Sequence, residues 1–77
     1  MPLFFFDLHN DDVAIDEEGR ECADLGAAKV WATTEARNIA ADDVSQGKLV
    51  TSHRIDILDC ARRLLASVSF GEAVAIS

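Results

Sequence analysis

The chain of 77 residues contains little cysteine, glycine or proline, and these shortages exclude several kinds of site. Its two cysteines, Cys22 and Cys60, lie far apart and form neither a CxxC motif nor a Cys/His cluster, so no disulfide framework or zinc site is predicted. We interpret each as a small apolar residue that stays reduced in a cytosol. The four glycines are isolated, which excludes a glycine-rich loop for phosphate binding.

Basic residues are also scarce, because seven Lys and Arg stand against fourteen Asp and Glu, for a formal net charge of −7. Binding of nucleic acid through phosphates needs a clustered basic surface, and Arg62-Arg63 is the only adjacent basic pair, so no nucleic-acid partner is expected. No apolar run approaches the roughly 18 residues of a membrane span, and no basic residue precedes Asp7, as it would in an ordinary signal peptide. We therefore expect a single small domain, residues 1–77, that is cytoplasmic and makes no membrane contact.

The stretch from Asp24 to Gly47 predicts the only long helix. Its first residue is an N-cap and its last is the glycine that commonly follows a helix, so we place the end within Ala41–Gln46. Because Asp42 and Asp43 would put negative charge at the negative end of the helix dipole, we favour an early, fraying end. Apolar residues at helical spacing form one stripe that would lie against a sheet: Leu25, Ala28, Ala32, Ala36, Ile39 and Ala40.

Two large residues of this helix, Val30 and Trp31, fall off the stripe. Both are expected to point to solvent or to something other than the sheet. Trp31 has two interpretations: it lies at the edge of the core and covers the loop before the helix, or it anchors a partner interface, where Trp is enriched.

Four apolar segments around the helix have the alternation that is typical of strands. They are Leu3–His9, Val13–Ile15, Arg54–Leu58 and Arg63–Phe70. The order β-β-α-β-β predicts an α+β fold, an antiparallel sheet of three to four strands with one long helix packed on one face. In the first strand, Phe4, Phe6 and Leu8 would face the helix. The tail of residues 71–77 carries no strong signal, and its order stays open.

A single helix can cover only one face of such a sheet. The other face would carry Leu3, Phe5, Leu65 and the serines of the last strand, so that face or the sheet edge is the expected place for a second copy of the chain. A domain of this size buries only about 60–65% of its unfolded surface, and dimerisation would enlarge its marginal core. We therefore predict a homodimer, with Phe5, Trp31 and Leu65 as candidate interface residues.

Several short motifs in a fixed order carry a family resemblance. They are Met1-Pro2, Phe4-Phe5-Phe6-Asp7, Asp16-Glu17-Glu18-Gly19, Asp24-Leu25, Ala27-Ala28, and the closing pattern from Ile55 through Asp59 to Val68 and Phe70. Together they resemble a family of short alphaproteobacterial proteins known as domain-of-unknown-function family 6894. In that family the last hairpin typically turns on a glycine, where this chain has Arg62. The resemblance implies no activity, cofactor or catalytic residue.

A looser analogy links the chain to HicB-type antitoxins, which also run strand, strand and then a capped helix. The matching residues would be Asp24-Leu25 and the alanines that follow. This is a likeness of fold only, and fold does not give function.

The one group of residues with the composition of a metal site is acidic and lies between residues 7 and 18. It comprises His9 with Asp7, Asp11, Asp12, Asp16, Glu17 and Glu18. A calcium-binding EF-hand loop that began at Asp7 would need Gly at Asp12 and a carboxylate or amide at His9, so we interpret the group as a solvated acidic hairpin.

Nucleophilic catalysis has no clear candidate. Ser52 and His53 are adjacent in a strand and would point to opposite faces, while Cys60 beside a histidine stays open. We expect neither an enzyme nor a bound cofactor or metal. The leading hypothesis is a protein-interaction or structural module that acts as a homodimer. The alternative is an antitoxin-like regulator whose acidic surface neutralises a basic protein partner.

Overall fold

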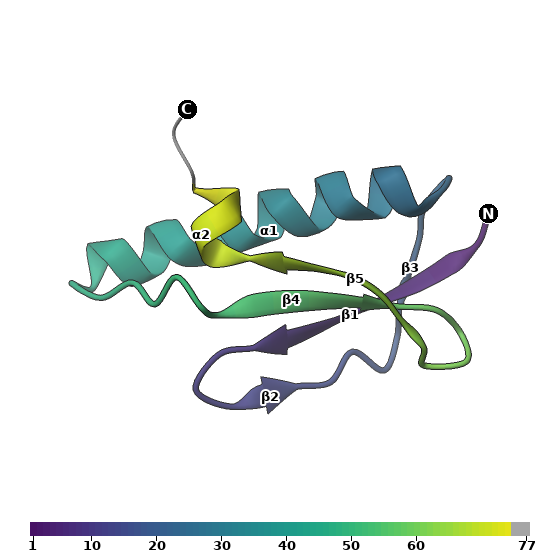
Figure 1. Ribbon diagram of the computed structural model, residues 1–77, viewed down its shortest axis with the longest axis horizontal. Coiled ribbons are helices and arrows are strands. Elements are labelled where there is room, and N and C mark those ends of the chain that lie inside the picture. The colour runs from purple at the N-terminus through teal and green to yellow at the C-terminus, as the bar shows by residue number, and fades with distance from the viewer. Residues whose placement is uncertain (75–77) are drawn as a thin grey trace.

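The computed structural model describes residues 1–74, which form an α+β domain with an antiparallel sheet and one long helix (Figure 1). In chain order the elements are β1 (Leu3–His9), β2 (Val13–Ala14), β3 (Arg20–Glu21), α1 (Leu25–Ser45), β4 (Arg54–Leu58), β5 (Leu64–Ser69) and α2 (Phe70–Ala73). The predicted fold class is therefore confirmed, and the predicted elements occur in the predicted order, with β3 and α2 in addition. Within the tail of residues 71–77, the short helix α2 takes in the first three, whereas residues 75–77 lie outside the described part.

The sheet has the order β2-β1-β4-β5, and β3 pairs with the same strand edge of β1 as β2 does. All pairings are antiparallel, with Phe6 opposite Ile57 and Ile57 opposite Ala66 in the central register. Strand β3 was not predicted, because two residues are too short to show an alternation. The sheet therefore has five strands instead of the predicted three to four.

The core lies between the sheet and α1, which runs along β4 and β5 in Figure 1. From the sheet come Phe4 and Phe6 of β1 and Ile55 and Ile57 of β4, all buried as their alternation predicted. From the helix come four alanines with no exposed surface: Ala28, Ala32, Ala36 and Ala40. Because this stripe has only methyl side chains, the helix backbone can lie close to the sheet.

The two ends of α1 are fixed by local hydrogen bonds. At the start, the Asp24 carboxylate accepts from the Ala27 N–H at 2.8 Å, as an N-cap does. At the end, Gly47 has a φ of +83° and its N–H donates to the Val44 carbonyl at 2.9 Å, while the Lys48 N–H donates to the Asp43 carbonyl at 2.9 Å.

The helix ends within the predicted range Ala41–Gln46, but the preference for an early end in that range was wrong. The helix continues through Asp42 and Asp43 to Ser45. Each exposed carboxylate near a helix C-terminus costs only about 0.3–1 kcal/mol, and the two hydrogen bonds of the glycine cap offset that cost. The last turn therefore forms despite its unfavourable charges.

Candidate functional site

The sheet face opposite α1 is built around buried, paired carboxylates. Asp7 and Asp56 are 4% and 8% exposed and are the two buried charged residues in the described part of the chain. Asp7 accepts from the Arg62 guanidinium on one oxygen and from the Asp16 N–H, at 3.0 Å, on the other. Since a buried charge is tolerated only when it is paired and hydrogen-bonded, these contacts account for the burial of Asp7.

Asp16 closes the outer edge of β1 where β2 has ended and β3 has not begun. Its carboxylate accepts from the Phe6 N–H at 3.1 Å, so a side chain takes the place of a neighbouring strand. It also accepts from the N–H groups of Glu18 and Gly19, both at 3.1 Å. Burial alone would raise the pKa of Asp16, but these backbone donors and nearby Arg62 together lower the pKa below its usual value.

Gly19 completes this closure with a positive φ of +76°. A Cβ there would lie 3.0 Å from side-chain carbons of Leu3 and Phe5, so the loop rests directly on the sheet. Asp16, which we interpreted as part of a solvated acidic hairpin, thus has a structural role together with Gly19.

A second network surrounds Asp56 on the same face. Its carboxylate accepts from Arg54 Nε at 2.9 Å and from Ser67 Oγ at 2.7 Å, and it lies 3.0 Å from His9 Nε2. Burial would raise the pKa of Asp56, but the Ser67 hydroxyl, the Arg54 guanidinium and His9 together lower it.

The arrangement around Asp56 does not couple a nucleophile to a base. Arg54 Nη2 lies 3.4 Å from His9 Nδ1, and His9 Nε2 lies 3.0 Å from an Asp56 oxygen, so both ring nitrogens have neighbours other than Ser67. Ser67 Oγ donates to the Asp56 carboxylate, and neither ring nitrogen of His9 is a hydrogen-bond partner of Ser67. A catalytic serine needs a hydrogen bond to its base, so this cluster has the geometry of a structural network.

The remaining chemical candidates are dispersed. Cys22 is buried, as expected of a small apolar residue, whereas Cys60 is exposed with its Sγ 3.7 Å from the Leu3 carbonyl oxygen. In residues 1–74, no three His, Cys, Asp or Glu side chains are grouped so as to hold a metal ion. No helix in that range is long and apolar enough to cross a membrane.

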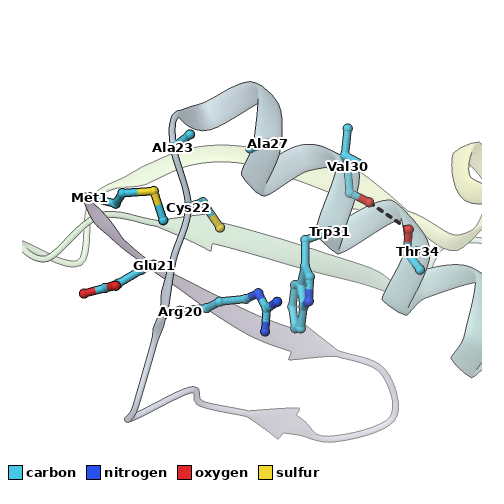
Figure 2. Close-up of a pocket in the computed structure, with 9 residues that line it drawn as sticks. All are labelled: Met1, Arg20, Glu21, Cys22, Ala23, Ala27, Val30, Trp31 and Thr34. Atoms are coloured by element: carbon cyan, nitrogen blue, oxygen red, sulfur yellow. Dashed lines mark hydrogen bonds between the residues drawn. The ribbon is translucent and has the colours of Figure 1, made fainter.

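A shallow pocket of about 400 Å³ lies on the other side of the molecule, between the first half of α1, β3 and Met1 (Figure 2). Trp31 forms one wall. Its ring meets Phe6 at a centroid distance of 4.5 Å, and the Arg20 guanidinium lies 5.0 Å from the ring centroid. Trp31 therefore sits at the edge of the core and covers the segment before the helix, with part of its surface left to the pocket.

The solvent side of α1 carries apolar residues next to this pocket. We define the outer seam as six exposed residues whose spacing alternates between three and four: Ala27, Val30, Thr34, Arg37, Ala41 and Val44. Val30 is 68% exposed, as predicted, and Val44 is 58% exposed. The first three seam residues also line the pocket. Sequence reasoning considered Val30 alone and missed the seam, although the spacing was readable in the sequence.

The structure does not bring the three candidate interface residues together. Phe5 is half-buried on the face opposite α1, with the Arg62 guanidinium 5.6 Å from its ring centroid. Trp31 is on the helix side, against Phe6. Leu65 lies where the β4–β5 register shifts and is 40% exposed.

Comparison with known proteins gives a family and nothing more specific. A family model described as Domain of unknown function (DUF6894) matches residues 3–71. No curated protein and no solved structure matches the chain.

Proposed function

The chain belongs to the DUF6894 family, whose description assigns no activity, and we propose that this protein is a small interaction module that acts as a homodimer. The observation that carries the proposal is the exposed apolar surface of the outer seam together with the pocket beside Trp31. Aromatic residues next to apolar, solvent-accessible surface are typical of protein interfaces.

The contrast with the opposite face supports binding over catalysis. There the carboxylates, guanidinium groups and histidine satisfy one another, and their hydrogen bonds run within the fold. We propose a non-enzymatic role on this basis. With two free cysteines, one of them exposed, we propose the reducing cytoplasm as its location.

Static light scattering at tens of micromolar tests the proposal directly. The expected result is a mass of twice that of the 8.3 kDa chain. A monomeric mass across the whole concentration range contradicts the proposal. The measurement is repeated at high salt, because a chain with a net charge of −7 repels its copies less when charge is screened.

A second candidate function is favoured by the acidic hairpin. Asp12, Glu17 and Glu18 are exposed there, and Val13 and Ile15 between them are each 54% exposed. A mixed acidic and apolar surface suits a basic protein partner, as in an antitoxin-like regulator. A captured basic protein supports this function only if neutralising Glu17 and Glu18 to Gln weakens its binding. Binding that is unchanged in that variant excludes the hairpin as its site.

A further inference from the structure

We infer that two copies of this chain pair through the outer seam of α1, with the two helices antiparallel. This inference rests on the proposed homodimer and specifies its surface. The first reason is the distribution of apolar residues on α1, which lie on both sides of the helix instead of on one stripe. A surface helix with one buried side normally shows a polar opposite side, whereas the solvent side of α1 carries two alanines and two valines among its polar residues.

The spacing of the outer seam identifies what kind of element covers it. Alternating intervals of three and four residues are the intervals by which one helix packs along another. The seam extends from Ala27 to Val44, nearly the whole of α1. Its small residues would allow two helix axes to approach to about 8–10 Å.

The order of residues along the seam favours a second copy in antiparallel orientation. With the two-fold axis midway between Thr34 and Arg37, Ala27 lies opposite the partner copy's Val44, and Val30 lies opposite its Ala41. Each valine then faces an alanine, so large and small side chains alternate across the contact. The same surface serves both copies, which is the requirement of a two-fold interface.

The fourth seam position is occupied by an arginine, but its guanidinium is engaged elsewhere. Arg37 Nε donates at 2.6 Å to the carbonyl of Ala73, the last residue of α2. In Figure 1, α2 lies beside the second half of α1. The guanidinium of Arg37 therefore lies at the C-terminal end of α2, where a cation is favourable.

Charges along α1 fit the antiparallel register. Asp42, which is unfavourable at the end of its own helix, comes level with the positive first half of the partner helix dipole. In a parallel pair, Asp42 and Asp43 of both copies would instead lie together.

The first test compares two exposed valines. Val30→Asp places a charge in the seam, and Val13→Asp places the same charge on β2, where the wild-type side chain is 54% exposed. Loss of an interface residue of this kind weakens binding by about 30-fold or more, so Val30→Asp should raise the dimer Kd by at least that factor while Val13→Asp leaves it within about threefold. Circular dichroism checks that both variants fold.

Disulfide trapping then tests the register, in a chain with Cys60→Ser. Positions 27 and 44 are about 25 Å apart along one helix, too far for a bond within one chain. The double variant Ala27→Cys, Val44→Cys should form covalent dimers on oxidation, and Ala27→Cys alone should not. Covalent dimers from Ala27→Cys alone would show parallel helices and overturn the register.

The outcomes separate the two proposals. A wild-type monomer at every concentration overturns the homodimer itself. If the wild-type chain is a dimer and Val30→Asp leaves the dimer Kd unchanged, the homodimer proposal stands and the outer seam is not its interface.

Discussion

The two outward surfaces of this domain differ in how far their charged and apolar groups are covered. On the sheet face away from α1, Asp7 and Asp56 are buried and each is matched by an arginine. On the solvent side of α1, small apolar residues stand exposed beside a half-open pocket. The charged groups of the first surface are paired within one chain, whereas the second surface keeps exposed apolar side chains. This difference is why we propose the helix side, and not the open sheet face, as the interaction surface.

The largest effect is expected from breaking the buried charge pair at Asp7. Asp7→Asn removes the ionised partner of Arg62 and should lower the free energy of unfolding by about 2–4 kcal/mol, less than for a fully buried pair because the Arg62 side chain is 40% exposed. Urea denaturation measures it, with Asp12→Asn on the exposed hairpin as the control. A loss below about 0.5 kcal/mol would show that Asp7 is not held as a structural charge.

A somewhat smaller effect is expected from enlarging the inner side of α1. Ala36→Leu introduces three carbons where the alanine has no exposed surface, and the resulting strain should cost about 1–3 kcal/mol. Asn38→Leu, on the exposed side of the same helix and outside the outer seam, is the matched control and should change stability little. Equal effects of the two substitutions would contradict the close helix–sheet contact.

The turn at Arg62 allows the backbone and side-chain contributions to be separated. Arg62 has a φ of 62°, which is the left-handed conformation that a glycine adopts without strain. Arg62→Ala should lose the ion pair and keep the strain, while Arg62→Gly should lose the ion pair and relieve the strain. The glycine variant should therefore be more stable than the alanine variant by about 1 kcal/mol, with both below wild type. Equal stabilities of the glycine and alanine variants would show that the backbone at Arg62 is not strained.

The smallest effect concerns pH. The pKa values of Asp16 and Asp56 are lowered in the folded protein from a usual value of 3.8. Between the folded and the unfolded pKa, the unfolded chain therefore binds more protons than the folded one. The stability from these carboxylates is fully present above the unfolded pKa and is lost as pH falls through the folded pKa. Asp16→Asn should make the decrease in unfolding free energy smaller as the pH is lowered from about 5 to about 2, the range in which carboxyl groups titrate. Glu17→Gln is the control.

Structural features that depend on residues close together in the chain could be predicted from the sequence. The Asp24 cap, the Gly47 terminus and the alanine stripe of α1 are local patterns, and the structure confirms them. The alternation of β1 likewise placed Phe4 and Phe6 in the core. These features follow from helix and strand periods that any chain of this composition must obey.

What could not be predicted depends on pairs that are distant in sequence. Asp7 and Arg62 meet only because β1 lies beside β4 and the turn that follows it. In the sequence Asp7 stands next to a run of other acidic residues, so composition favoured a solvated hairpin. Asp16 was missed for the same reason, since its role is to accept a hydrogen bond from Phe6 on a strand ten residues away.

The most direct measurement of the central claim is a dilution series of amide NMR spectra of the wild-type chain, which maps the surface that changes as the assembly dissociates. We expect the amide chemical shifts to change with concentration at the seam residues Ala27, Val30, Thr34, Ala41 and Val44, and to stay unchanged at Phe5 and Asp56. Shifts confined to Phe5, Leu65 and the rest of the opposite sheet face would contradict it.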